Sequence, residues 1–224
     1  MVPRVVSLVP SVTETLLAWR VEPIACTRFC QQPALRHVGG TKDPDVAAIA
    51  GLAPDLVVVD EEENRREDHE ALVAAGLTVH VLAVRDLAGL DAQMADLADV
   101  VSARWEPIGQ IEVPPPMRRA WVPIWKRPWM ALGEPTYGSA VVRTLGFDNV
   151  AAPDGAYPEV DPRVARERRT DVVIAPSEPY PFAARHRPEL EAAARDVRFV
   201  DGRDLLWWGE RTRTALGRLR VALS

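Results

Sequence analysis

Two stretches of the sequence follow the same pattern. Residues 43–64 read DPDVAAIAGLAPDLVVVDEEEN, and residues 161–182 read DPRVARERRTDVVIAPSEPYPF. Each begins with Asp-Pro at the start of a short helical segment and continues into an apolar strand and a polar loop. The two stretches lie 118 residues apart, and the segments VHVLAVRDL, ending at Leu87, and VRFVDGRDL, ending at Leu205, repeat that offset. The chain is therefore predicted to contain two copies of one half.

Strand and helix patterns alternate within each half. The strands predicted in the first half are residues 4–8, 24–27, 56–59 and 77–82, and the helices are residues 11–19, 43–51 and 62–75. The strands predicted in the second half are residues 120–124, 172–175 and 197–200, and the helices are residues 138–145, 161–168 and 189–195. Such alternation is typical of α/β lobes in which parallel sheets carry helices on both faces.

Several local signals set the expected helix starts and the domain boundaries. Ser11 and Glu14 have the spacing of a capping box, and Asp43 followed by Pro44 is a typical helix start. We expect an N-terminal lobe over residues 1–90 and a C-terminal lobe over residues 120–224. The connector, residues 91–119, is predicted to hold a helix over residues 91–104 and a stiff proline run.

Composition and charge exclude several classes of protein. The 224 residues are 47% hydrophobic and 26% charged, as in ordinary globular proteins, and no apolar run approaches the ~20 residues of a membrane helix. The net charge of −5 does not favour nucleic acid as a partner. The N-terminus shows no leader pattern, which predicts a cytoplasmic protein, or an extracytoplasmic one if a leader has been removed.

Ligands of open α/β sheets bind beyond the carboxyl ends of the strands, so the loops there are the candidate sites. The first such loop opens a helix whose free N–H groups could receive an anion or carbonyl, or could simply be capped. The loop from Cys26 to His37 holds two thiols and an imidazole, but their spacing matches no zinc signature. Cys30 is either a small buried hydrophobe or a thiol that faces the ligand. The acidic run 60–63 is either a solvated helix start or a polar wall of a cleft.

Aromatic residues concentrate in the second half and follow its strands. Six of them are expected on one rim: Trp125, Trp129, Tyr180, Phe182, Trp207 and Trp208. Flat apolar faces with few polar anchors suit a large planar ligand, although packing between lobes would produce the same pattern.

Signatures of common enzymes are missing from the sequence, including G-x-G-x-x-G, the Walker A motif, H-E-x-x-H and G-x-S-x-G. Paired carboxylates such as Glu62 and Glu178 could still serve acid–base chemistry across a cleft. A further alternative is a metal-ion site that uses Cys30 and His37.

Longer strings of the sequence resemble a known family. RVVSLVPSVTETLLAW (residues 4–19), VGGTKDPDVAAIAGLAPDLVVVDEEENRRED (38–68) and GLTVHVL (76–82) resemble the substrate-binding proteins of cobalamin and iron-siderophore ABC importers, the helical-backbone metal receptors of the class III periplasmic-binding-protein type. VPIWKRPWM (122–130), IAPSEPYPF (174–182) and FVDGRDLLWWG (199–209) resemble a leaderless subgroup described as cobalamin-binding. The resemblance covers nearly the whole chain.

The resemblance implies two Rossmann-like lobes joined by a helix, with a corrinoid or ferric chelate held in the cleft. It implies a binding protein without catalytic activity, no protein-bound metal, and an ABC transporter permease as a partner. The alternative is a cytoplasmic enzyme or chaperone that acts on a tetrapyrrole or nucleotide-like substrate. The positions nominated for ligand binding, from their place after strands, are Ser11, Thr13, Phe29, Cys30, Lys42, Glu61, Glu62, Trp125, Trp129, Tyr180 and Trp208.

Overall fold

The computed structural model describes residues 3–224, which group into two compact units. Unit 1 takes the chain through Val84, together with Gly89–Pro107 and Trp208–Glu210. Unit 2 takes Arg85–Ala88, Ile108–Trp207 and Arg211–Ser224. The segment 91–119, predicted as a connector, is thus divided between the two units.

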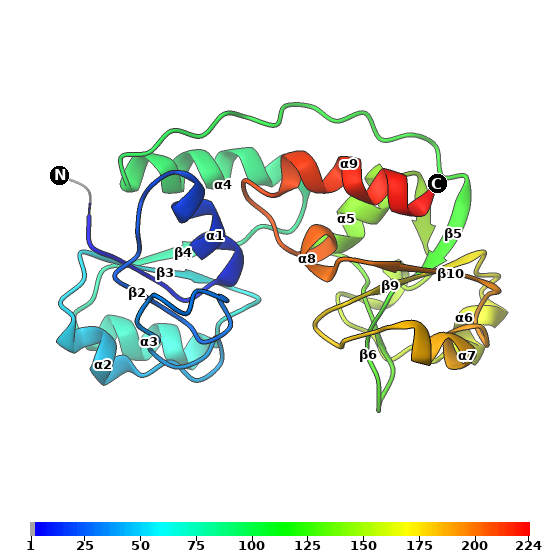
Figure 1. Cartoon of the computed structure of the whole chain (residues 1–224), viewed down its shortest axis with the longest axis horizontal. Coiled ribbons are helices and arrows are strands. Elements are labelled where there is room, and N and C mark those ends of the chain that lie inside the picture. Colours follow the sequence, from blue (N-terminus) through cyan, green and yellow to red (C-terminus); the bar gives the residue numbers. More distant parts are fainter. Residues whose placement is uncertain (1–2) are drawn as a thin grey trace. The chain divides into compact units, whose positions relative to one another are not determined.

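Unit 1 is built on a parallel sheet of four strands. These are β1 (Val5–Ser7), β2 (Ala25–Cys26), β3 (Leu56–Asp60) and β4 (Val79–Leu82), in the order β2-β1-β3-β4. Its helices are α1 (Pro10–Ala18), α2 (Val46–Gly51), α3 (Arg66–Ala74) and α4 (Leu87–Val100). In Figure 1, α1 and α4 lie on one face of this sheet, and α2 and α3 lie on the other.

Unit 2 repeats this architecture. Its parallel strands are β5 (Arg118–Trp121), β8 (Phe147–Asn149), β9 (Val172–Pro176) and β10 (Asp196–Val200), in the order β10-β9-β5-β8. Its helices are α5 (Tyr137–Thr144), α6 (Pro162–Glu167), α7 (Arg187–Leu190), α8 (Gly202–Leu206) and α9 (Thr212–Leu223), with 3₁₀ turns η1 (Ala152–Asp154) and η2 (Ala184–His186). Because β8-β5-β9-β10 follows the same path as β2-β1-β3-β4, the prediction of an α/β fold with two parallel sheets is confirmed.

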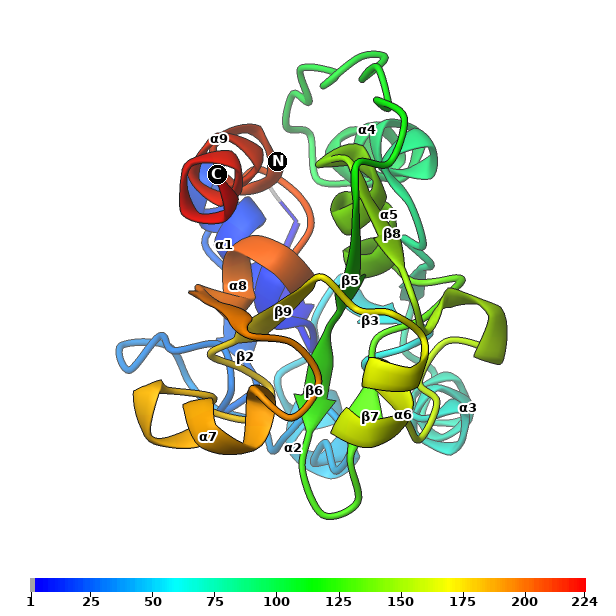
Figure 2. The same ribbon diagram turned by 90° about the vertical axis from the view of Figure 1, so that its right-hand side faces the viewer.

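Unit 2 has one addition that unit 1 lacks. After Trp121 the chain continues into β6 (Pro123–Trp125), which pairs antiparallel with β7 (Met130–Ala131). This β6–β7 hairpin projects past the parallel sheet, with α6 and α7 to either side in Figure 2. The single strand predicted over residues 120–124 is therefore wrong, because Val122 separates two strands that belong to different sheets.

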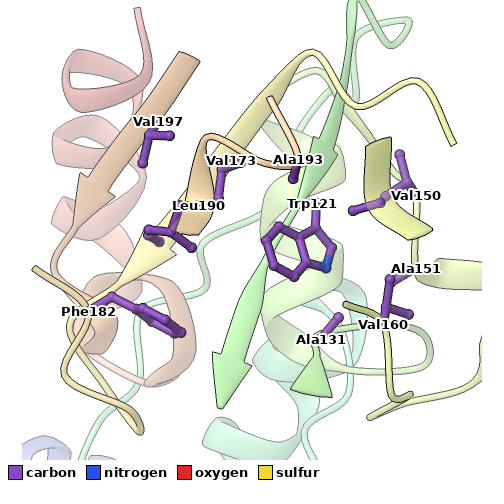
Figure 3. Close-up of a cluster of buried hydrophobic side chains, with 12 residues drawn as sticks. Trp121, Ala131, Val150, Ala151, Val160, Val173, Phe182, Leu190, Ala193 and Val197 are labelled. Carbon is purple, nitrogen blue, oxygen red and sulfur yellow. The ribbon is translucent and has the colours of Figure 1, made fainter. Parts of the chain in front are cut away.

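The two cores follow directly from apolar runs in the sequence. All five residues of β3 and of β9 are buried, as expected of central parallel strands covered on both faces. In unit 2 the indole of Trp121 is fully buried and lies among the small side chains of Val150, Ala131 and Ala193 (Figure 3). Leu190 and Phe182 belong to the same cluster.

Three predicted helix starts can be compared with the structure. Asp161 caps α6 by accepting hydrogen bonds from the N–H groups of Arg163 and Val164, with Pro162 at the first helical position, as predicted. The equivalent cap in unit 1 is Asp45 and not Asp43, whose carboxylate pairs with Arg28 instead. The capping box at Ser11 is wrong, because α1 already begins at Pro10 and Ser11 lies inside it.

Other helix boundaries also differ from the sequence prediction. The helix expected over residues 62–75 begins only at Arg66, because the acidic run forms a turn. The helix expected over residues 91–104 runs from Leu87 to Val100, and residues 103–117 have neither helix nor strand. Helices α8 and α9 had no counterpart in the prediction.

A short C-terminal segment of unit 1 packs on α1. Glu210 accepts a hydrogen bond from the Trp19 indole at 2.7 Å, and its own N–H donates to Thr15 Oγ1. Gly209 has a φ of +108°, and a Cβ there would lie 2.1 Å from Thr15 Oγ1. Only glycine fits this approach of the segment to the helix.

Asp204 joins α8 to α9 through two arginines. Its carboxylate, 5% exposed, accepts hydrogen bonds from Arg211 at 2.8 Å and from Arg218 at 2.6 Å. The hydrogen bonds from Arg218, followed by those from Arg211, lower the pKa of Asp204 below its ordinary value.

Replacing Asp204 should destabilise the protein in a pH-dependent way. Asp204→Asn leaves two guanidinium groups beside a neutral amide, and we expect a loss of about 3 kcal/mol at pH 7. Because the folded-state pKa is depressed, this stabilisation is present above the ordinary carboxyl pKa and is lost as pH falls through the folded-state value. Urea unfolding at pH 7 and pH 3 measures both effects.

The matched control is Asp148→Asn, which removes an exposed pair with Arg119 and should change stability by less than about 0.5 kcal/mol. Equal losses in the two variants would contradict a special role for Asp204.

Candidate functional site

The carboxyl ends of the parallel strands bring polar groups together at one edge of unit 1's sheet. β1 ends at Ser7, β2 at Cys26 and β3 at Asp60, and these strands are neighbours in the sheet. All three residues are buried. The sheet edge therefore carries two adjoining groups of buried polar side chains, one of hydroxyls and thiols and one around Asp60.

We call the first group the hydroxyl–thiol cluster; its members are Ser7, Thr13, Cys26, Thr27 and Cys30. Thr13 Oγ1 lies 2.8 Å from Ser7 Oγ and 3.2 Å from Cys30 Sγ, and Thr27 Oγ1 lies 3.2 Å from the same sulfur. Hydrogen bonding from the Cys26 thiol, with help from both threonines, lowers the pKa of Cys30, although burial opposes the shift. The same coupling raises the pKa of Cys26.

The second group is the turn that follows β3. Asp60 Oδ1 accepts hydrogen bonds from the N–H groups of Glu62 at 2.9 Å and Glu63 at 3.2 Å. Asn64 closes the turn: its Oδ1 accepts from the Asp60 N–H, and its amide donates to the carbonyls of Leu8 and Thr41. Asp60 Oδ2 is buried without a hydrogen-bond partner, and burial raises the pKa of Asp60 to about 7.

The nominated residues Lys42, Glu61 and Glu62 lie at this turn. The Lys42 ammonium donates a hydrogen bond to the Glu62 carbonyl and is otherwise exposed. Glu61 is exposed and Glu62 is half-buried. Backbone N–H groups, and not Arg65 or Arg66, oppose the charge of Asp60, because these arginines pair with Asp68 and Glu70.

Unit 2 presents aromatic rings in place of the polar groups. We call this set the aromatic cluster; its members are Trp121, Trp125, Trp129, Tyr180, Phe182 and His186. Trp129 stacks on Phe182 with an interplanar angle of 7°, and Trp125 meets Tyr180 edge to face at 5.7 Å. Trp125 is 45% exposed, so the cluster runs from the buried core to an open ring on the β6–β7 hairpin.

Two polar side chains accompany these rings. The Lys126 ammonium lies 5.8 Å from the centre of the Trp129 ring and pairs with Glu189. His186 Nδ1 accepts a hydrogen bond from the Ala183 N–H at 3.1 Å. Because that nitrogen needs its lone pair for the bond, a neutral His186 carries its proton on Nε2. Burial lowers the pKa of His186, which favours this neutral form.

The structure brings only some of the nominated residues together. Thr13 and Cys30 meet in the hydroxyl–thiol cluster, and Trp125, Trp129 and Tyr180 meet in the aromatic cluster. Trp207 packs against Arg203 and Arg211 instead, and the buried Trp208 belongs to unit 1. The sequence predicted one rim of six aromatic residues, and this prediction is wrong for Trp207 and Trp208.

The two remaining nominated residues have simpler surroundings. Phe29 is 50% exposed under the guanidinium of Arg28, and Ser11 is buried within α1. Sequence reasoning missed Ser7, Thr27 and His186, and it named Asp60 only as part of the acidic run 60–63. A polar residue directly after a run of apolar strand residues marks Ser7 and Asp60, but His186 had no such signal.

The metal-ion alternative depends on Cys30 and His37. The His37 ring is exposed and bonds the Gln32 carbonyl, and the His37 backbone pairs with that of Cys26 in an isolated bridge. Over residues 3–224, no group of three or more His, Cys, Asp or Glu side chains is placed to hold a metal ion. In the same residues, no helix is long and apolar enough to cross a membrane.

Solved structures share this fold at low sequence identity. The periplasmic vitamin B12 binding protein BtuF of Vibrio cholerae aligns with a TM-score of 0.79 at 18% identity, over 98% of this chain and 96% of its own. A periplasmic heme binding protein from Pseudomonas aeruginosa aligns with a TM-score of 0.79 at 19% identity, over 98% and 92% of the two chains.

A third structure, an ABC transporter substrate-binding protein from Listeria monocytogenes, aligns with a TM-score of 0.76 at 14% identity, over 98% of both chains. No family model matches the sequence, and no curated protein matches it. The chain therefore has the fold of these periplasmic binding proteins over almost its entire length.

The buried carboxyl of Asp60 should make stability fall as pH rises. Between the ordinary pKa of 3.8 and the folded value of about 7, the folded protein keeps a proton that the unfolded chain releases. Asp60→Asn retains the Oδ1 acceptor without a charge. At pH 8 it should be more stable than the wild type by a few kcal/mol, since each pKa unit is worth about 1.4 kcal/mol. The difference should vanish near pH 4.

Chemical unfolding between pH 4 and pH 8 measures this difference. Asp55→Asn, at the exposed amino end of the same strand, is the control and should show no such trend. An Asp60→Asn profile parallel to that of the wild type would show that the carboxyl is ionised in the fold without cost.

Proposed function

We propose that this chain is a non-catalytic binding protein for a metal chelate of the tetrapyrrole class, and that a corrinoid is its ligand. The observation that carries the proposal is the aromatic cluster, which ends in the half-exposed ring of Trp125. An exposed indole held edge to face by Tyr180 offers a fixed, flat apolar surface. Such a surface suits a large planar ligand better than a small polar metabolite or a bare ion.

The chemistry around the cluster favours a ligand that brings its own metal. His186, the imidazole of the cluster, offers an N–H and not a lone pair, because its Nδ1 is already occupied. It therefore suits a hydrogen bond to a polar substituent of the ligand rather than coordination. A heme usually draws an axial ligand from the protein, so this arrangement favours a corrinoid over heme.

The fold supports a binding function. The solved structures that align over the whole chain are described as binding vitamin B12 or heme, or as serving an ABC transporter. We extend the proposal to a permease partner that receives the ligand. In unit 1 we propose Ser11, Thr13, Phe29, Lys42, Glu61 and Glu62 as positions that contact polar groups of a ligand, with Cys30 and Trp208 in support.

Titration with hydroxocobalamin tests the proposal. We expect saturable binding near one ligand per chain, with a dissociation constant of micromolar or tighter, about −8 kcal/mol. Trp125→Ala should weaken binding about tenfold, because a stacking aromatic contact contributes on the order of 1 kcal/mol. Calorimetry and quenching of tryptophan fluorescence provide two independent measurements.

Tyr157→Ala is the matched control, because Tyr157 is as exposed as Trp125 and lies outside the aromatic cluster. It should bind like the wild type. If hemin binds and hydroxocobalamin does not, the assignment of a corrinoid is wrong, but the assignment to the tetrapyrrole class stands. Absence of binding to both would overturn the proposal.

The enzyme alternative is tested in the same preparation. A binding protein returns the corrinoid unchanged after long incubation, as judged by mass spectrometry of the extracted ligand. Conversion of the ligand, lost in Glu62→Ala or Glu178→Ala while binding persists, would instead establish catalysis.

A further inference from the structure

The hydroxyl–thiol cluster contains two reduced cysteines whose surroundings differ. Both are free and buried: Cys26 is the last residue of β2, and Cys30 follows after a tight turn closed by a hydrogen bond from its N–H to the Thr27 carbonyl. Cys26 and Cys30 flank this turn, Thr27 Oγ1 lies 3.2 Å from Cys30 Sγ, and the Cys26 thiol is close enough to the Cys30 sulfur to lower the pKa of Cys30.

The surroundings make the two sulfurs unequal. Cys30 Sγ has the hydroxyls of Thr13 and Thr27 at 3.2 Å, and both can donate to a thiolate. In the part of the chain that the structure describes, no hydroxyl hydrogen-bonds to the Cys26 sulfur, and the Cys26 thiol is itself the donor toward Cys30. A thiolate is the reactive form of cysteine, so Cys30 is the nucleophile of the pair and Cys26 the neighbouring thiol.

We propose that Cys26 and Cys30 form a site of reversible oxidative modification, in which a small peroxide converts the two thiols into an intramolecular disulfide. The proposal does not depend on the ligand of the protein. Cys30 is only 3% exposed, so hydrogen peroxide fits the site better than a bulky disulfide reagent.

The chemistry balances with peroxide as the only oxidant. The Cys30 thiolate attacks one peroxide oxygen, the O–O bond breaks, and the products are Cys30 sulfenic acid and hydroxide. The sulfur of Cys26 then attacks the Cys30 sulfur, an S–S bond forms, and the hydroxyl leaves as water with the Cys26 proton. In total, two thiols and one peroxide give one disulfide and two waters, and an added dithiol reverses the oxidation.

Formation of the disulfide would also change the sheet edge. A disulfide sulfur is a far weaker acceptor than a thiolate, so the hydrogen bonds of Thr13 and Thr27 to Cys30 would weaken. The turn between the cysteines carries Arg28 and the exposed Phe29. Oxidation would therefore change the conformation of this exposed turn at the carboxyl end of β2.

Treatment of the purified full chain with hydrogen peroxide tests the site. We expect loss of both free thiols, a mass decrease of two hydrogens in the monomer, a peptide linking residues 26 and 30, and full recovery with dithiothreitol. In Cys26→Ser the sulfenic acid of Cys30 should persist and be trapped by dimedone when the oxidised protein is unfolded in its presence. In Cys30→Ser the remaining thiol should react at least tenfold more slowly than Cys30 does.

A conservative pair of variants removes any dependence on how the cysteine variants fold. Thr13→Val deletes a hydroxyl donor to Cys30 and should slow oxidation several-fold. Thr15→Val, on the same helix, deletes a hydroxyl that donates to the Ser11 carbonyl and accepts from the Glu210 N–H but bonds neither sulfur, and it should oxidise at the wild-type rate. Peroxide treatment that leaves both thiols free, links separate chains, or drives Cys30 to the sulfinic acid while Cys26 stays free would overturn the proposal.

Discussion

In both units, one fully buried strand pairs with two parallel neighbours, and this pairing determines where functional side chains can lie. β3 lies between β1 and β4, and β9 lies between β5 and β10. Since every side chain of these central strands is buried, the strands themselves expose no side chain to a ligand. Polar and aromatic groups are therefore concentrated in the segments that leave the strand ends. In unit 1, β3 ends at the buried Asp60 and leads into the turn 61–64, and the corresponding segment in unit 2 carries Tyr180 and Phe182.

The two units have the same strand order but place different chemistry at equivalent positions. Unit 1 gathers hydroxyls and thiols that hydrogen-bond to one another, and a carboxyl that accepts from backbone N–H groups. Unit 2 gathers stacked rings, and the extra β6–β7 hairpin supplies two of them. The repeated fold thus carries a polar sheet edge in unit 1 and an apolar sheet edge in unit 2.

The parts of the fold that depend on local sequence could be predicted. The 118-residue offset and the apolar runs around Val57 and Val173 identify two parallel sheets, and Asp161-Pro162 identifies the start of α6. The identical dipeptide at Asp43-Pro44 does not start α2, because Arg28, distant in sequence, binds the Asp43 carboxylate and Asp45 takes over as the cap. Local pattern could not show this competition between partners.

In the candidate site too, some features follow from local sequence and others depend on contacts between distant residues. Thr13 and Cys30 follow strands, so topology alone brings them to one edge, and Trp125, Trp129 and Tyr180 lie in one cluster of rings for the same reason. Trp208 could not be placed, because its unit is decided by the packing of the segment 208–210 on α1 through Gly209 and Glu210. The reactivity assigned to Cys30 depends on two threonine hydroxyls at 3.2 Å, and no spacing in the sequence gives that distance.

The segment Trp208–Glu210 also bears on how such a chain can be divided or can have arisen. After Pro107 the polypeptide leaves unit 1 for unit 2 and returns to unit 1 for the three residues Trp208–Glu210 before it forms α9 of unit 2. Neither unit is consequently encoded by one uninterrupted stretch of the gene. A fragment ending at Pro107 would lack Glu210, the hydrogen-bond partner of the Trp19 indole. A fragment beginning at Ile108 would include Trp208–Glu210, which belong to unit 1. If the repeat began as a tandem duplication, the copies have since lost their independence as separable modules.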